Sequence, residues 1–196
     1  DFAAHPKEIH VGIPMDSRLT MDVPATIDSL KMGFLPHIRP HSHQLPTSFV
    51  VMGKEMRIDL LTYPKGSDRD SPVQIPRLNT YAQPLEFMNY LLEKSMNGLI
   101  VNGGATLVRI PEPARFALHK LLVASNRDSR SQTKAEKDRQ QATQLLTFLQ
   151  EERPGDILLA GEELVLKGRS WRDRLRQQAG KLSMQFRELD EVLASS

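Results

Sequence analysis

The prolines divide this chain into two parts that differ in what they can fold into. Of the 13 prolines, 11 lie in residues 1–112, and the apolar runs between them are short. Proline is disfavoured in helix interiors and central strands, so this part favours short elements. From Pro113 onward, apolar residues recur at three- and four-residue spacing, which is the period of an α-helix. We therefore predict two domains, a sheet domain over residues 1–112 and a helical domain over residues 113–196.

The apolar pattern of the first part predicts a small mixed sheet with flanking helices. Leu19, Met21 and Val23 alternate with polar residues, which is the period of a strand. Two apolar-rich runs joined around Gly53 predict a β-hairpin. The predicted elements, in chain order, are a strand over 17–23, a helix over 25–34 that closes at Gly33, a hairpin over 48–63, a helix over 84–95 and two strands over 97–111.

The second part predicts a helical bundle. Its apolar-periodic segments are separated by the breakers "DSRS", "RPGD" and "KGRS". The predicted helices cover residues 113–126, 132–152, 155–167 and 169–193. The fold class is therefore α+β, with a small mixed β-sheet and flanking helices followed by a C-terminal helical bundle.

Composition excludes several function classes. The chain has no cysteine, so it forms no disulfide, no cysteine-bound zinc site and no reactive thiol. No run approaches the about 18 apolar residues of a membrane span, and no signal-peptide pattern opens the sequence. We expect a cytoplasmic protein with no membrane partner. The net charge of +2 does not require a nucleic-acid partner, and it permits one only if basic residues cluster in space.

Two aspartates are the candidate metal ligands. Asp22 and Asp59 each lie in a strand-like run, on the polar side of the alternation, and Arg57 shares the face of Asp59. Carboxylates on neighbouring strands can hold Mg²⁺, which prefers a few protein oxygens and completes its shell with water and phosphate. The alternative is that both are surface aspartates of edge strands. Segment 37–43 carries three histidines, for which we favour a polar loop over a metal site.

Lys120 is the candidate anion-binding residue. It lies in a predicted helix that is apolar on almost every side, with Phe116 about one turn away. A lysine in such a place either extends its ammonium group to water or meets an anion. On the next predicted helix, Lys134, Asp138 and Gln141 share a face. The alternative there is a solvated first turn with a Lys–Asp pair that contributes roughly a few tenths of a kcal/mol.

The order of these motifs is more specific than any one of them. The stretches "RLTMDV", "FVVMGKEMRIDLLTY", "VRIPEPARFALHKLLVASNR" and "KAEKDRQQATQLLTFL" follow one another along the chain. In this order they resemble a family of bacterial nucleotidyltransferase-fold proteins related to the AbiEii- and MenT-type transferases, which antitoxins control. The resemblance covers roughly residues 10–160. It implies a polymerase β-like sheet whose cleft is completed by the helical domain.

The resemblance also implies a set of site residues. In that family an Asp-x-Asp pair on the first strand and a third carboxylate on a later strand hold Mg²⁺ ions that bridge the nucleotide phosphates. By position, Asp22 and Asp59 would be the first and third carboxylates, and therefore both metal ligands and catalytic residues. Lys120 would contact the triphosphate, and Asp138 would lie beside it as a further catalytic or positioning group. The other implied nucleotide-binding residues are Arg127, Lys134 and Lys137.

Two positions depart from the family pattern. Pro24 stands where the second carboxylate of the pair is expected, and the glycine-rich turn expected before the first strand is reduced to Gly12. Two functions therefore stay open. The first is Mg²⁺-dependent transfer of a nucleoside monophosphate from an NTP to a hydroxyl of RNA, tRNA in particular, or of a protein. The second is a catalytically impaired module that binds a nucleotide, a nucleic acid or a partner protein.

A nucleic-acid-binding adaptor is the third function that the residues allow. Its RNA affinity would fall steeply as the salt concentration rises. A cognate antitoxin is a further partner that the resemblance implies. The basic residues of such an adaptor would be Arg115, Arg127, Arg130, Lys134 and Lys137.

Overall fold

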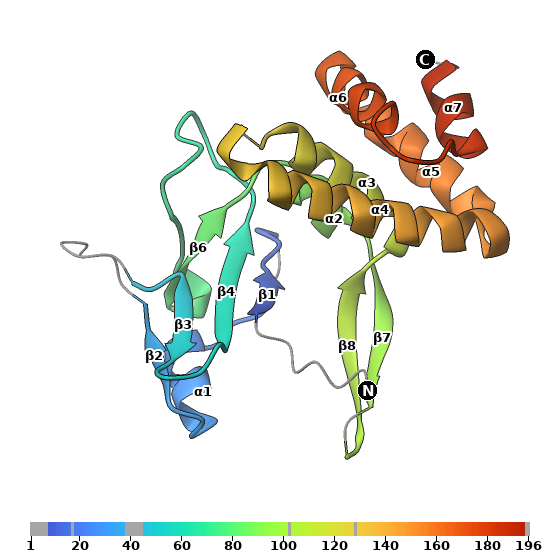
Figure 1. The fold of residues 1–196 in the computed structure, drawn as a ribbon. Coiled ribbons are helices and arrows are strands. Elements are labelled where there is room, and N and C mark those ends of the chain that lie inside the picture. Colours follow the sequence, from blue (N-terminus) through green and yellow to red (C-terminus); the bar gives the residue numbers. More distant parts are fainter. Residues whose placement is uncertain (1–7, 17, 38–44, 102, 128, 195–196) are drawn as a thin grey trace. The chain divides into compact units, whose positions relative to one another are not determined.

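The structure is a computed structural model of the chain, and it describes residues 8–16, 18–37, 45–101, 103–127 and 129–194 (Figure 1). Its contacts divide the chain into two compact units, one up to Leu92 and one from Glu93 onward. We call them the sheet unit and the helical unit and describe each by itself. The two strands predicted over 97–111 thus belong with the helices. The division into a sheet domain and a helical domain after residue 112 stays a prediction.

The sheet unit holds a six-stranded mixed sheet. Its strands are β1 (Glu8–Gly12), β2 (Phe34–Pro36), β3 (Ser48–Val51), β4 (Arg57–Thr62), β5 (Val73–Ile75) and β6 (Thr80–Pro84). The strand order is β2-β3-β4-β6-β5, with β1 paired to β4 beside this path. β1 and β6 run parallel to β4, whereas β3 runs antiparallel to it. Strand β4 therefore pairs with three other strands, β1, β3 and β6.

The hairpin of β3 and β4 confirms the prediction for residues 48–63. At its turn Gly53 has a φ of +74°, a conformation that glycine adopts without strain. Along β4 the side chains alternate, because Ile58, Leu60 and Thr62 are buried and the residues between them are half-buried. One face of β4 therefore carries the core, and the other face carries Arg57, Asp59 and Leu61.

The strand predicted over residues 17–23 is wrong for the part of that segment that the structure describes. Asp22 instead begins helix α1 (Val23–Ser29) as its N-cap. Its carboxylate accepts a hydrogen bond from the backbone N–H of Ala25, a donor that the first turn would otherwise leave unsatisfied. Pro24 lies in the same first turn, where the missing N–H of proline costs nothing. The cap and the proline together outweigh the alternation.

The two predicted short helices of this unit exist but are shorter. α1 ends at Ser29 rather than at Gly33. α2 (Met88–Glu93) covers only the middle of the segment 84–95. Phe87, which precedes α2, has a φ of +67°, so the backbone turns there before the helix begins. The expected boundaries were therefore too wide.

The helical unit begins with a two-stranded ribbon, which Figure 1 shows extending from the helices of that unit. Its elements are β7 (Ser95–Val101), β8 (Ala105–Pro111), α3 (Pro113–Ser125), α4 (Gln132–Glu152), α5 (Pro154–Val165), α6 (Arg169–Ala179) and α7 (Arg187–Ala194). The antiparallel ribbon and the helices α3, α4 and α5 confirm the predictions to within two residues. Within the described residues, no helix combines the length and the apolar character that a membrane span requires.

The helix predicted over residues 169–193 is two helices. α6 packs against α3, whereas α7 packs against α5, so the break between them lets one segment cover two different neighbours. Gly161 on α5 permits the approach of α7, because a Cβ atom there would lie 2.9 Å from the side chain of Val192. Leu175 and Leu189 anchor the two helices in the core.

Each unit has its own core. The core of the sheet unit comes from α1 and from the strands around β4. In the helical unit, α3 and α4 pack through fully buried leucines, each of which contributes about 1.5–3 kcal/mol on leaving water. These leucines are Leu118, Leu121, Leu122, Leu146 and Leu149. The same packing fixes the positions of Lys120 on α3 and Asp138 on α4.

Candidate functional site

The helical unit brings Lys120, Arg127 and Asp138 together. Lys120 Nζ donates to Asp138 Oδ1 at 3.0 Å, and Arg127 Nη2 donates to Asp138 Oδ2 at 3.0 Å. A second bond runs from Arg127 Nε to Oδ2 at 3.3 Å. We call these three residues the Asp138 cluster. The family resemblance implied that Asp138 lies beside Lys120, and the structure brings the two side chains into contact.

The Asp138 cluster is a buried carboxylate held by two partly exposed cations. The side chain of Asp138 is 6% exposed, and those of Lys120 and Arg127 are 23% and 32% exposed. A buried carboxylate is tolerated only when it is paired and hydrogen-bonded, which both cations achieve. The cluster keeps a net charge of +1. A lysine and an arginine together offer about eight N–H donors, more than one carboxylate accepts, so the cations can also bind an outside anion.

Gln141 adds a polar atom one turn further along α4. Its side-chain Oε1 is buried, and it has no hydrogen-bond partner among the described residues. A buried acceptor of this kind costs free energy unless a donor meets it. Because Gln141 follows Asp138 by three positions, both lie on one side of α4. A hydroxyl or amino group of a ligand would satisfy it.

The remaining predicted nucleotide-binding residues lie on the surface of α4. Lys134 and Lys137 are exposed, and Lys137 lines a shallow pocket together with Glu136 and Arg139. Lys134 is thus exposed to solvent whereas Asp138 is buried, although the two share a helix face. The structure does not gather Lys134 and Lys137 into the Asp138 cluster. Their binding role stays a prediction.

Asp59 lies at the centre of a polar group in the sheet unit. Its Oδ1 accepts hydrogen bonds from Ser48 Oγ at 2.7 Å and from Arg57 Nε at 2.6 Å. His10 Nε2 lies 3.6 Å from its Oδ2. The register explains the grouping, because His10 of β1 and Ser48 of β3 are both cross-strand partners of Asp59. The pairing of Ser48 with Asp59 was not predicted, although the hairpin register contains it.

Asp22 is engaged as a helix cap. Besides the bond from Ala25, its Oδ2 accepts a hydrogen bond from Asn79 Nδ2 at 2.8 Å. The backbone N–H of Ala25, and then the amide of Asn79, hold the pKa of this carboxyl below its usual value. The side chain is exposed. In this conformation Asp22 stabilises the start of α1.

The residues present do not form a ready magnesium site. Mg²⁺ requires several oxygen ligands in near-octahedral geometry, and the described residues contain no group of three His, Asp or Glu side chains that could hold a metal ion. Asp22 and Asp59 both accept hydrogen bonds from protein donors, and Pro24 brings no ligand. The Mg²⁺ requirement therefore stays a prediction. His41 and His43 lie outside the described residues.

A second ion-pair network holds the helical unit together. Arg115 is 1% exposed, and it donates to Glu163 Oε2 at 2.6 Å and to Glu93 Oε2 at 2.8 Å. Lys94 pairs with Glu163, and Lys167 pairs with Glu93. Burial alone would raise the pKa of Glu93, but the bonds from Lys167 and Arg115 lower it overall. The expectation that Arg115 lies on a nucleic-acid-binding surface is therefore wrong.

Sequence signals did not reveal this second network. Glu163 lies 48 residues after Arg115, and no local spacing links the two. A buried arginine among apolar neighbours was the available signal, since Ala114, Ala117 and Leu118 surround it on α3. The network fixes the start of α3 and thus supports the helix that carries Lys120.

Comparison with known proteins adds the family. A sequence model of a nucleotidyltransferase family matches residues 1–165. No curated protein and no solved structure matches the chain, so the relation to the AbiEii- and MenT-type transferases stays a prediction. The mixed sheet with a helical C-terminal region is consistent with the nucleotidyltransferase fold. Because the match covers more than four fifths of the sequence, the chain belongs to the nucleotidyltransferase family.

Proposed function

We propose that this protein binds an NTP through the Asp138 cluster and transfers the nucleoside monophosphate to a hydroxyl of RNA, tRNA in particular, or of a protein. Family membership supports the transfer chemistry. The observation that carries the binding site is the buried Asp138 between the two partly exposed cations Lys120 and Arg127. A triphosphate needs this combination of positive charge and fixed position.

The proposed reaction is a substitution at the α-phosphorus of the NTP. The oxygen of the acceptor hydroxyl forms a bond to the α-phosphorus, and the bond from that phosphorus to the oxygen bridging to the β-phosphate breaks. Pyrophosphate leaves with the electron pair, and the proton of the hydroxyl passes to solvent. Little covalent work falls on the protein, so the task of the cluster is to position the phosphates and offset their charge.

Within the proposal the three residues of the cluster have different tasks. Lys120 and Arg127 donate to phosphate oxygens. Asp138 is a positioning residue, because both of its oxygens are occupied by the two cations. The role of Asp22 and Asp59 as catalytic metal ligands is no part of this proposal and stays a prediction, which the Mg²⁺ titration tests. An antitoxin partner and a cytoplasmic location likewise stay predictions.

A second candidate function is nucleotide binding without transfer. The specific observation that favours it is the state of the carboxylates, since Asp22 caps α1 and Asp59 accepts hydrogen bonds from Ser48 and Arg57. Pro24 replaces the second carboxylate of the family pair. In this case the Asp138 cluster binds the phosphates, and no product forms.

Isothermal titration with ATP, CTP, GTP and UTP, each with and without Mg²⁺, tests both candidates. Binding that requires Mg²⁺ and that Asp59→Asn abolishes supports the transferase. Equal binding without Mg²⁺ supports the module. We expect Lys120→Met to weaken NTP affinity by at least about tenfold, because a charge-assisted hydrogen bond contributes about 1.5–3 kcal/mol.

The matched control for Lys120→Met is Lys181→Met, which removes an exposed lysine of the same unit. It should leave NTP affinity within twofold of wild type. If the two variants bind NTP equally well, the Asp138 cluster is not the phosphate site. If no NTP binds to the wild-type protein under any condition, both candidates are overturned.

A further inference from the structure

The segment that contains α6 carries more positive charge than the whole chain. Residues 167–181 hold six basic side chains and one acidic side chain, a net charge of +5, whereas the chain as a whole has +2. The other residues are therefore net negative. The family match ends at residue 165, before α6 begins. This charge concentration belongs to a part of the chain that the family assignment does not describe.

Three of these cations form a row along α6. Arg169, Arg172 and Arg176 follow one another at spacings of three and four residues, so they lie on one side of the helix. The row spans about 10 Å along the helix axis, at 1.5 Å per residue. Asp173 lies 3.7 Å from both Arg169 and Arg176, so a single carboxylate is shared between two cations. The row, which we call the α6 row, keeps an excess of positive charge.

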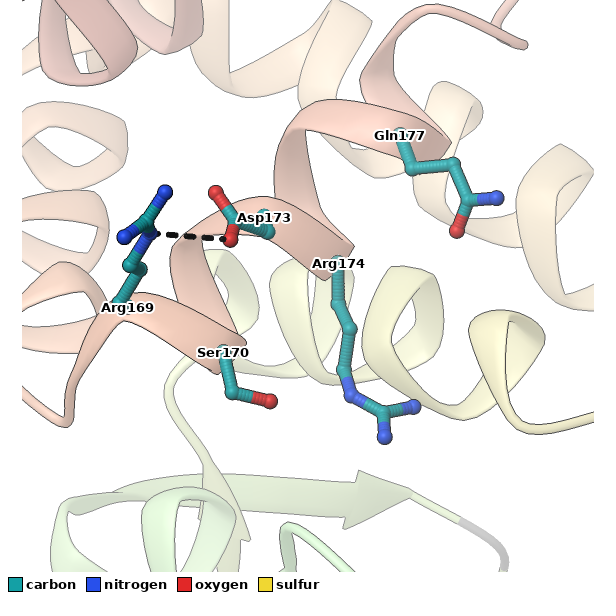
Figure 2. Close-up of a pocket in the computed structure, with 5 residues that line it drawn as sticks. All are labelled: Arg169, Ser170, Asp173, Arg174 and Gln177. Carbon is teal, nitrogen blue, oxygen red and sulfur yellow. Dashed lines mark ion pairs between the residues drawn. The ribbon is translucent and has the colours of Figure 1, made fainter.

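The fully exposed residues of α6 are all polar, whereas Arg172 of the row is half-buried. A shallow pocket on it is lined by Arg169, Ser170, Asp173, Arg174 and Gln177 (Figure 2). The side chain of Arg169 is 85% exposed. The apolar residue Leu175 faces the core instead. Apolar side chains adjoin only one end of the row, where Arg176 lines a pocket with Leu182 and Met184. The polar, arginine-rich remainder fits a phosphate backbone, whereas a helix that lies in a membrane surface needs an apolar face along its length.

The neighbouring residue Arg174 connects α6 with the end of α3. Arg174 Nη1 donates to Asn126 Oδ1, and it lies 3.4 Å from Ser125 Oγ. Asn126 immediately precedes Arg127 of the Asp138 cluster. The basic residues of α6 and the cluster therefore adjoin each other within the helical unit.

We propose that the α6 row is a nucleic-acid-binding surface that contacts the phosphate backbone. Arginine is favoured over other groups for this partner, because its planar guanidinium pairs with phosphate through two parallel hydrogen bonds. The fully exposed residues of α6 include no aromatic side chain on which a base could stack, so the expected binding is independent of sequence. The proposal stands without the transfer reaction, since it concerns residues outside the Asp138 cluster.

Fluorescence anisotropy with a labelled single-stranded RNA of about 20 nucleotides, and with a DNA strand of equal length, tests the proposal. The variant is Arg169→Gln/Arg172→Gln/Arg176→Gln. We expect it to lose at least tenfold in affinity near 50 mM salt. The slope of log affinity against log salt should also fall by about 2, because three phosphate contacts are lost at about 0.7 each. Melting curves check that the triple variant folds. If it does not fold, the double variant Arg169→Gln/Arg172→Gln is used instead, because it retains the hydrogen bond from Arg176 to the carbonyl of Leu193.

A matched control separates position from net charge. Arg109→Gln/Arg153→Gln/Arg187→Gln removes the same charge from exposed arginines of other elements, and it should bind RNA within twofold of wild type. Equal losses in both triple variants, or no loss in either, would overturn the proposal. The proposal would also be overturned if anionic lipid vesicles or poly-glutamate displaced the RNA at the same concentration of negative charge. NTP affinity should be unchanged in the α6 variant, so a failure here leaves the proposed function standing.

Discussion

Asp22 and Asp138 show two ways in which a protein keeps a carboxylate in place. Asp22 is exposed, and one of its two bonds comes from the backbone of Ala25, three residues away. Asp138 is buried, and both of its partners come from outside its own helix. The first arrangement depends on local backbone geometry. The second depends on the packing of α3 against α4.

The difference indicates at which of the two carboxylates a substitution should change the stability of the fold more. A capping aspartate can be exchanged for asparagine with little effect, because the cap requires an acceptor and not a charge. A buried aspartate between two cations requires the charge itself, since either side left alone would be an uncompensated ion. We therefore expect changes at the Asp138 cluster to affect stability much more than changes at Asp22.

The largest effect is expected when both cations of the cluster are removed. Lys120→Met/Arg127→Met leaves Asp138 buried without a partner, and the free energy of unfolding should fall by about 3–5 kcal/mol. Urea denaturation measures it. Each single variant should lose less than half of this amount, because the other cation still pairs with Asp138. A double variant as stable as wild type would show that Asp138 is not a buried ion.

Removing the carboxylate as well should restore most of that loss. The triple variant Lys120→Met/Arg127→Met/Asp138→Leu replaces the whole ion cluster by apolar groups, which is often neutral for stability. We expect it to recover at least half of the lost free energy of unfolding in the same urea experiment. The double variant serves as its reference. A triple variant less stable than the double would contradict the charge explanation and indicate a packing defect.

A smaller effect is expected at the helix cap. Asp22→Ala removes the acceptor for Ala25, and the Tm should fall by roughly a few degrees. Asp22→Asn keeps the acceptor for Ala25 but loses the bond from Asn79, so its Tm should lie between that of Asp22→Ala and that of wild type. The control is Asp28→Ala on the same helix, whose exposed side chain pairs only with Lys31 in the bonds described. If Asp22→Asn keeps the Tm but abolishes Mg²⁺-dependent activity, Asp22 is a metal ligand as well as a cap.

The smallest effect is a pH dependence of the same cap. The pKa of Asp22 is lowered in the folded state, so its contribution to stability is complete above the ordinary aspartate pKa of 3.8. That contribution is lost as the pH falls through the lowered folded value. The Tm difference between wild type and Asp22→Ala should therefore be constant above about pH 5 and shrink below pH 4. A difference that grows at acid pH would mean the opposite sign of the shift.

The sequence predicted the helical unit better than the sheet unit. The period of α3, α4 and α5 extends over many residues, and breakers mark their ends, so the boundaries agreed to within two residues. Short segments carry a weaker signal, and the alternation of residues 17–23 was overridden by the cap at Asp22 and by Pro24. The break before α7 was missed because it follows from packing against two different helices.

The candidate site was predictable only where contacts follow from helix spacing and the family resemblance. The pairing of Lys120 with Asp138 was expected, and the structure confirms the contact. Arg127 was predicted to bind the nucleotide, but its pairing with Asp138 was not predicted. The network around Arg115 joins residues far apart in sequence, so no local pattern could reveal it. Long-range ion pairs depend on how the helices pack, which the sequence alone does not give.

Pro24 has a consequence for how this chain relates to others of its family. The first turn of a helix accepts proline, and it also accepts an acidic residue, which the helix dipole favours there. The backbone at this position therefore does not require proline. A lineage could lose or regain an aspartate two places after Asp22 without rebuilding the protein around it.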